Sequence, residues 1–239
     1  MKILREIIAS LPKDIQMRSV LVGAHWTVVC SRGCGMASTI LAECAHGHDE
    51  VRDAGNLHAK RAHELAEYAL SDNPLEASIG VATINSLLDI KVDENEQRNA
   101  SEVLMRYGKK KKVALVGHFP FIPKLREVAG ELWVIEKRPM EGEHSFETAS
   151  EFIPQADIVA ITGSSLINHT LEELLSFCKP GALVMMLGPS TPLSPILFEH
   201  GVSILSGSLV VDESAVLNTV SQAANFRQVK GVKLVTLFK

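Results

Sequence analysis

The fold of this chain follows from the stretch Lys112-Val113-Ala114-Leu115-Val116-Gly117-His118-Phe119-Pro120-Phe121-Ile122-Pro123-Lys124-Leu125. A short, continuous apolar run ends at a glycine, and a proline-containing turn and a helical pattern follow it. Such a run is typical of a strand that is buried on both faces, as the strands of a parallel sheet are. The stretch therefore predicts one strand–turn–helix unit of an α/β fold.

The same unit recurs three times further along the chain, with apolar runs at 132–136, 157–163 and 182–188. Helical segments separate these runs. Strands that alternate with helices predict βαβ crossovers and a doubly wound, mostly parallel sheet. Ligands of such sheets bind outside the carboxyl ends of the strands, so the loops that follow the strands should carry function. These loops begin at Gly117, Glu136, Gly163 and Gly188.

Length and composition allow two domains and weigh against one class of partner. The chain has 239 residues, of which 46% are hydrophobic and 22% charged, so it can bury a sizeable core. Its formal net charge of -4 is unlike that of a nucleic-acid-binding protein, which carries a strongly basic face. A polar stretch at 93–98 predicts the joint between an α+β domain, residues 1–92, and an α/β domain, residues 93–239.

The sequence predicts a cytoplasmic protein with no membrane partner. Residues 1–11 form an amphipathic helical pattern and lack the apolar core of a signal peptide. The longest apolar runs, such as 183–187, are too short to cross a bilayer. Four cysteines without a secretion signal are typical of reduced thiols rather than of a disulfide framework.

The first domain is predicted to contain strands followed by helices. Runs at 17–22 and 26–30 predict a hairpin, and a third strand is expected at 36–41. Helical patterns follow at 57–70 and 75–88. The second of these is apolar on most sides and should therefore be buried.

Capping patterns set helix starts in the second domain. Thr170-Leu171-Glu172-Glu173 predicts a capping box, and Asp212 is expected to cap a later helix. A fifth short strand is expected at 202–205. The last strand, 232–238, alternates enough to be an edge strand.

The turn after the first strand occupies the place of the phosphate-binding turn in dinucleotide folds. It lacks the G-x-G-x-x-G pattern, and Phe119 stands where a glycine would let the backbone approach a pyrophosphate. A standard NAD or FAD site is therefore disfavoured. Anion binding by the helix start stays open, although Pro120 lacks an N–H donor. His118 is either an acid/base group or metal ligand, or a residue that caps its own turn.

Glu136 ends the second strand, 19 positions after Gly117. An acidic residue at that place accepts hydrogen bonds from ribose hydroxyls in nucleotide-binding folds. The alternative is a surface carboxylate that pairs with Lys137 or Arg138. The loop at 138–144 is expected to be mobile and able to close over a ligand.

Small and hydroxyl-bearing residues follow the third and fourth strands, where they leave room for a ligand and offer hydrogen bonds. Asn168 either contacts a ligand or forms a local turn. A serine nucleophile is not indicated, because the G-x-S-x-G pattern is absent. The ligand-binding residues predicted at all four loops are Gly117, His118, Phe119, Pro120, Glu136, Thr162, Gly163, Ser164, Asn168, Thr170, Gly188, Pro189 and Ser190.

The sequence offers six candidate metal ligands. Cys30 and Cys34 have passable spacing but no second pair, so a structural zinc site is not expected. A divalent transition metal is still a possible cofactor. The candidate ligands are Cys30, Cys34, Cys44, His46, His48 and His118.

The phrases at 116–120, 134–136, 161–170 and 187–192 together resemble a prokaryotic family of unknown function for which heavy-metal chelation has been suggested. The likeness covers nearly the whole chain. It implies a first domain similar to the N-terminal domain of enolase, without enolase's catalytic barrel, and a Rossmann-like second domain with partial likeness to methyltransferases. It also implies a link to metal chelation, with corrinoid (vitamin B12-like) metabolism as the suggested setting.

Two functions follow from these observations. The first is a cleft protein that binds a nucleotide-like or corrinoid/tetrapyrrole-like small molecule between the domains, with or without a metal; an anabolic enzyme is one form of this hypothesis. His118, Glu136, Asn168 and Ser190 would orient the ligand. The alternative is a non-catalytic protein that sequesters a soft metal with cysteines and histidines of the first domain. A second copy of the chain is a further possible partner.

Overall fold

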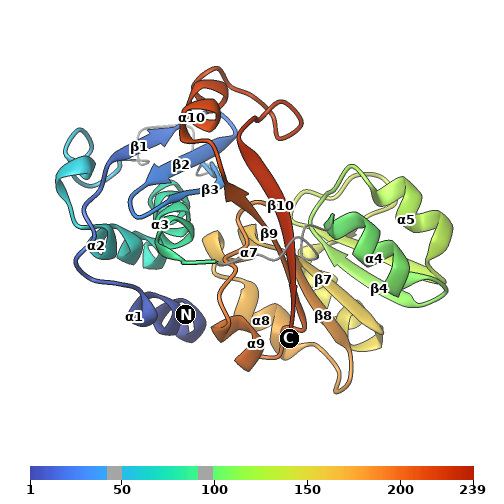
Figure 1. Ribbon diagram of the computed structural model, residues 1–239. Helices are drawn as coiled ribbons and strands as arrows, with labels where there is room; N and C mark the ends of the chain where they lie inside the picture. The colour runs from blue at the N-terminus through green and yellow to red at the C-terminus, as the bar shows by residue number, and fades with distance from the viewer. Residues whose placement is uncertain (42–49, 91–98) are drawn as a thin grey trace.

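The computed structural model describes residues 1–41, 50–90 and 99–239. These residues form two sheets (Figure 1). A small antiparallel sheet has the order β1-β2-β3, and a seven-stranded, mostly parallel sheet has the order β10-β9-β8-β7-β4-β5-β6. The predicted fold class is confirmed. The predicted domain boundary, between residues 92 and 93, lies outside the described residues.

The small sheet contains the predicted hairpin and a third strand that starts earlier than predicted. Cys34 lies directly opposite Cys30, because the turn between the last two strands takes only residues 31–33. The third strand ends at Ser38, whose N–H donates to Ser190 Oγ at 2.8 Å. The strands are β1 (Ser19–Val22), β2 (Trp26–Cys30) and β3 (Cys34–Ser38).

The single helix predicted at 57–70 is wrong. Lys60 and Arg61 are extended, Arg61 forms a bridge with Gln16, and the Ala62 N–H donates to Ile15 O at 2.9 Å. This long-range pairing divides the segment into a short turn before Lys60 and a second helical part, residues 62–70, after Arg61. The helices of the first half are α1 (Lys2–Ser10), η1 (Leu57–Ala59), α2 (Ala62–Ala66), η2 (Glu67–Leu70) and α3 (Pro74–Leu87). Most residues of α3 are buried, as predicted.

The large sheet has the strand order of dinucleotide-binding folds. When the strands are numbered in chain order from β4, the strands β6-β5-β4-β7-β8-β9 follow the order 3-2-1-4-5-6, and the strand order reverses between the parallel strands β4 and β7. The last strand lies at the edge, as predicted, and it is antiparallel to β9. The strands are β4 (Lys112–Val116), β5 (Glu131–Glu136), β6 (His144–Ser145), β7 (Ile158–Thr162), β8 (Leu183–Leu187), β9 (Ile204–Val210) and β10 (Val232–Phe238).

Two strands of this sheet differ from the prediction. The loop at 138–144 leads into β6, a short strand that pairs with the end of β5. The strand β9 continues to Val210 instead of ending at 205, because it pairs with β10 over its whole length. The small and polar residues Ser206, Gly207 and Ser208 concealed this extension in the sequence.

Helices cover both faces of the large sheet (Figure 1). On one face, α4 (Ala100–Gly108) and α5 (Ile122–Val128) pack on Leu115 and Val134. On the other face lie α6 (Ala149–Phe152), α7 (Ser164–Ile167), α8 (Leu171–Ser176) and α9 (Ile196–Glu199), with the turns η4 (Phe146–Thr148) and η5 (Ile153–Gln155). One continuous hydrophobic core joins this second face to the first half of the chain.

The last helix, α10 (Glu213–Ser221), packs on the small sheet, where Val216 and Val220 contact Val28 and Met36. Asp212 caps α10 as predicted, because its side chain accepts a bond from the Ala215 N–H at 3.0 Å.

The capping box predicted at Thr170 is wrong. Thr170 has helical backbone angles, and its side chain makes no cap bond. An N-cap side chain reaches the first free N–H groups from an extended backbone, which Thr170 does not have. Glu172 accepts from the Ile3 N–H at 2.8 Å, which ties α8 to α1.

Candidate functional site

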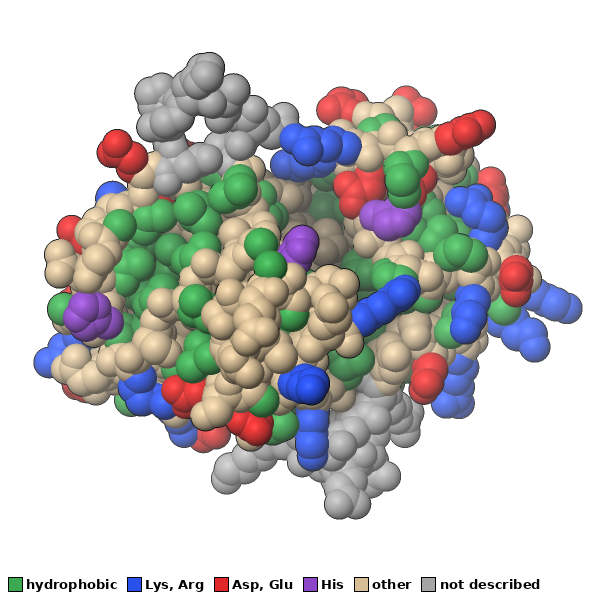
Figure 2. Space-filling view, turned by 90° about the horizontal axis from the view of Figure 1, so that it is seen from above, with side chains coloured by type: hydrophobic (Ala, Val, Ile, Leu, Met, Phe, Trp, Pro, Cys, Tyr) green, Lys and Arg blue, Asp and Glu red, His purple; other side chains and the backbone are tan. Residues whose placement is uncertain are grey.

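The loops after β4, β5, β7 and β8 meet at one edge of the large sheet. The Gly117 N–H donates to Ile135 O at 3.0 Å, and the Gly163 N–H donates to Leu187 O at 2.8 Å, so each loop is bonded to a neighbouring strand. We call residues 117–121, 136–143, 162–164 and 188–191 the rim. Figure 2 looks onto this edge and shows a surface that is hollowed between the two halves of the molecule.

Glycines let the rim loops pack closely. Gly117 and Gly188 have positive φ angles, 113° and 106°, which side chains rarely adopt. A Cβ at Gly163 would lie 2.5 Å from the Thr191 N. Gly117 and Gly163 are both buried, and a side chain at either position would meet its neighbours.

Two carboxylates orient His118. Its ring Nδ1 lies 2.7 Å from Glu143 Oε1, and its backbone N–H donates to Glu136 Oε1 at 2.7 Å. The ring therefore bonds Glu143 instead of capping its own turn. With Nδ1–H held by a carboxylate, Nε2 has no hydrogen-bond partner among the described residues, which is the arrangement of a base or of a metal ligand.

Glu143 is charged in this arrangement. Its side chain is only 6% exposed. Burial by itself raises the pKa of Glu143, but the Met140 N–H, the hydrogen bond from His118 and the nearby positive charges together bring the pKa below its ordinary value. The carboxylate stays ionised and holds the His118 ring in place.

Two predicted ligand-binding residues, Ser164 and Ser190, connect the two halves of the chain. Ser190 is 2% exposed, and its hydroxyl is bonded to the N–H and the hydroxyl of Ser38. The Ser164 hydroxyl also reaches Ser38, at 3.3 Å.

The other hydroxyl and amide candidates lie at the end of β7, at the end of α7 and at the start of α8. The Thr162 Oγ1 accepts from the Ser164 N–H at 3.3 Å. Asn168 ends α7 and Thr170 begins α8, both half-buried.

A cavity of about 400 Å³ opens beside the rim, on the sheet face that carries α4 and α5. Phe119 and Phe121 line it as a stacked pair, with ring centroids 5.2 Å apart and planes 21° apart. Of the predicted ligand-binding residues, the cavity wall contains Phe119, Pro120, Gly188 and Pro189. The other wall residues on which its chemistry depends are Asn99, Ser101, Lys124, Ser206, Leu234 and Val235.

The metal candidates separate into three sets. Cys44, His46 and His48 lie outside the described residues, so sequestration by that set stays a prediction. His118 belongs to no group of three close potential ligands in the described part of the chain. Cys30 and Cys34 do belong to such a group, with Glu213, but they are joined as a disulfide. The expectation that these two cysteines are reduced thiols is therefore wrong for this structure.

Sequence reasoning missed the residues that complete both clusters. Glu143 lay inside the loop at 138–144, and its acidic neighbours gave no sign of which carboxylate would be buried. Glu213 lies 195 positions after Arg18, its ion-pair partner, and far from both cysteines in the chain. No sequence pattern links residues so far apart. The sequence placed Phe121 in a turn, but it did not predict that the ring stacks on Phe119.

The fold and the rim define a two-part α/β protein with a Rossmann-like sheet. The chain belongs to the DUF364 family of proteins of unknown function, described as "Putative heavy-metal chelation", whose model matches residues 99–239. A second model with the same description, DUF4213, matches residues 4–88. The family resemblance found in the sequence is confirmed.

Three proteins are similar to this chain. An uncharacterised protein of Methanocaldococcus jannaschii is 28% identical over 207 residues, which cover 84% of this chain and 79% of that protein. A structure from Desulfitobacterium hafniense, of the same family and of unknown function, has a TM-score of 0.88 at 27% identity. One from Pyrococcus horikoshii has a TM-score of 0.81 at 21% identity and supports the fold alone. Both matches cover 100% of this chain and 98% of the other.

Among the helices that the structure describes, none combines the length and the apolar character that a membrane span needs.

Proposed function

We propose that this protein is cytoplasmic and that it binds, beside its rim, a small molecule that has a flat apolar body and an anionic group. The observation that carries the proposal is the cavity of about 400 Å³ beside Phe119 and Phe121. Its place, at the carboxyl edge of a doubly wound sheet, is where such folds bind ligands. Its volume is within the range of small-molecule sites.

The cavity walls favour a ring system with a charge at one end. The stacked faces of Phe119 and Phe121 offer an apolar surface for a planar group. Lys124 supplies a positive charge, and Asn99 and Ser101 supply polar groups. The volume is at the lower end of the usual range, which favours a nucleotide-like body buried whole over a corrinoid or other tetrapyrrole held by one edge.

His118 does not line the cavity but directly precedes Phe119, so it is the candidate reactive group beside the site. Glu143 holds its Nδ1–H, and Nε2 has no partner in the described part of the chain. In an enzyme, Nε2 would act as a general base on the ligand. In a binding protein, it would instead hold the ligand or a divalent metal.

Direct binding measurements test this proposal. Calorimetry should compare adenosine nucleotides with a porphyrin and a cobalamin, each added to wild-type protein. Leu234→Trp fills the cavity with an indole and should weaken binding at least about tenfold, a loss of about 1.4 kcal/mol. Phe119→Ala should weaken the same ligand through the loss of stacking.

The matched control is Val211→Trp, which adds the same indole at an exposed position that does not line the cavity. Binding that is unchanged in Leu234→Trp and in Phe119→Ala would remove the cavity from the site. If only macrocycles bind, the nucleotide-like class is excluded.

A further inference from the structure

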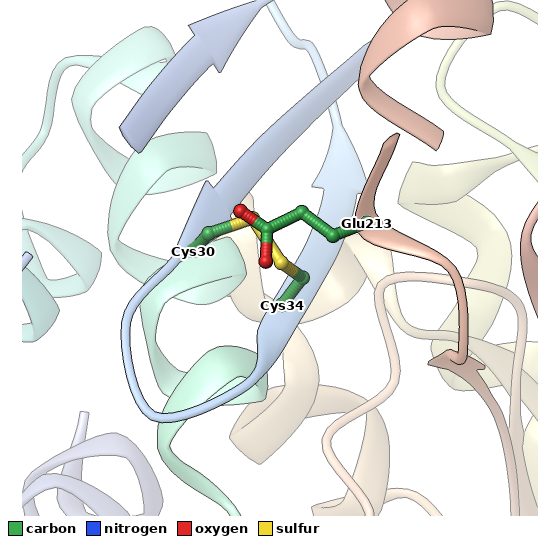
Figure 3. A group of neighbouring side chains, drawn as sticks. All are labelled: Cys30, Cys34 and Glu213. Atoms are coloured by element: carbon green, nitrogen blue, oxygen red, sulfur yellow. A yellow bond between two sulfur atoms is a disulfide. The ribbon is translucent and has the colours of Figure 1, made fainter. Parts of the chain in front are cut away.

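A second cluster lies away from the rim, where α10 meets the small sheet (Figure 3). Cys30 ends β2, Cys34 begins β3, and Glu213 is the first residue of α10. One potential ligand atom from each residue lies within 4.8 Å of the other two. We call these three residues, with Arg18, the cysteine corner.

The backbone holds the two cysteines together independently of their covalent bond. Cys30 and Cys34 are directly opposite each other in the antiparallel ladder of β2 and β3. Helix α3 packs on one face of this sheet through Val29 and Ala37, and α10 packs on the other. Reduction of the disulfide would therefore leave both thiols beside Glu213.

Charge makes the reduced corner fit a divalent cation. With the disulfide intact, the Glu213 carboxylate is balanced by Arg18, whose Nη1 forms an ion pair with it. Arg18 Nη2 also lies 3.8 Å from Cys34 Sγ, and a guanidinium beside a sulfur favours the thiolate form. Two thiolates would bring the corner to a net charge of −2, which one divalent cation would neutralise.

We propose that the cysteine corner is a redox-gated binding site for a soft divalent cation such as zinc or cadmium. Two molecules of a thiol reductant, R′SH, convert the Cys30–Cys34 disulfide into two thiols and leave as R′S–SR′. The cation then displaces one proton from each thiol. Two sulfurs and a Glu213 oxygen bind it, and water takes the fourth position, as in zinc sites with an open coordination position.

Oxidation empties the site. A disulfide such as oxidised glutathione takes up two electrons and two protons, the Cys30–Cys34 bond forms again, and the cation is released. The ion can enter from solvent, because the Glu213 side chain is 37% exposed and Cys34 is half-buried. Cys178 offers no comparable site, because it forms no disulfide and burial raises its pKa to about 11.

Cadmium binding tests the site directly. The protein carries Cys44→Ser and Cys178→Ser, so that only Cys30 and Cys34 remain, and is reduced with a phosphine that does not bind the metal. We expect one cadmium per chain by equilibrium dialysis, with a thiolate-to-cadmium absorption band in the ultraviolet. After oxidation with oxidised glutathione, both signals should be lost.

Two variants define the ligands. Glu213→Gln should weaken cadmium binding about tenfold, whereas Glu199→Gln, which neutralises an exposed carboxylate on α9, should leave it unchanged. Cys34→Ser should abolish binding. Because Cys34→Ser could fold poorly, a second measurement keeps both Cys30 and Cys34. It asks whether bound cadmium protects these two thiols from an alkylating reagent. Equal binding by reduced and oxidised protein, equal affinity in the two glutamate variants, or absent protection would each overturn the proposal.

Discussion

The rim and the cysteine corner are assembled in different ways. The rim collects residues from four loops that follow parallel strands, so regular sheet geometry brings them to one edge. The corner joins Arg18, Cys30 and Cys34, from the start of the chain, to Glu213, 195 positions after Arg18. They meet only because α10 covers the small sheet. A site made by a repeating unit can be anticipated from a sequence, and a site made by one docked helix cannot.

The same packing shows that the halves of the chain depend on each other. α10 belongs to the second half by sequence, yet its buried residues Val216 and Val220 lie against the small sheet of the first half. Ser38, at the end of that sheet, is bonded to Ser190 on the rim. The effect of a substitution in one region should therefore be measured in both regions. The free energy of unfolding and the binding of ligand or metal are the quantities to compare.

The largest effect is expected for Gly35→Ala, which would push β3 away from α3. The new Cβ would lie 2.3 Å from both Ala82 O and Ser86 N. Both are backbone atoms of α3, so the helix or the strand would have to move to relieve the overlap. We expect a loss of about 3 kcal/mol in the free energy of unfolding, measured in urea, together with weaker cadmium binding at the corner. Gly33→Ala is the matched control, since its Cβ would meet only Ser86 O at 3.6 Å. Equal losses would show that β3 and α3 are not tightly packed.

At the rim, Glu143→Gln should cost about 1–2 kcal/mol at neutral pH, because a buried carboxylate loses charge-assisted bonds to His118 and Met140. Folding lowers the pKa of Glu143 below 4.5. Its contribution is therefore complete above pH 4.5 and is lost as the pH falls through the lower, folded-state pKa.

The free energy of unfolding, measured across acidic pH, should thus converge for wild type and Glu143→Gln below pH 4.5. Glu141→Gln, at an exposed position of the same loop, should follow the wild-type curve. Parallel curves for wild type and Glu143→Gln would contradict the lowered pKa.

A smaller effect is expected where α10 begins. Asp212→Ala removes the side-chain bond to the Ala215 N–H and should cost about 1 kcal/mol, measured by thermal or urea unfolding. Asp212→Asn keeps an acceptor oxygen and should recover most of this loss. A full loss in Asp212→Asn would mean that the carboxylate acts through its charge rather than as a cap.

The smallest effect is expected at Thr170→Ala. By sequence Thr170 is as good a cap as Asp212, but its side chain makes no cap bond. The free energy of unfolding should change by less than about 0.5 kcal/mol. A loss as large as that of Asp212→Ala would restore the capping box that the sequence predicts.

These cases show why some features could be predicted and others could not. The buried strands β4, β5, β7 and β8 are continuous apolar runs. This pattern predicts a buried strand whichever elements pack on it. The segment at 57–70 has a helical pattern, but a bridge between Arg61 and Gln16 overrides it. Partners distant in sequence decide such outcomes, and a local pattern does not contain them.

By itself, the sequence determined the alternation of strands and helices, the edge position of β10, and the four loops that share one rim, because periodicity and chain order specify a doubly wound sheet. Only the tertiary structure decided that Ser190 joins the two halves, that Glu143 holds His118, and that Glu213 faces two cysteines. These outcomes depend on which surfaces pack together. Packing is set by the shape and charge of whole elements and leaves no repeating pattern in the sequence.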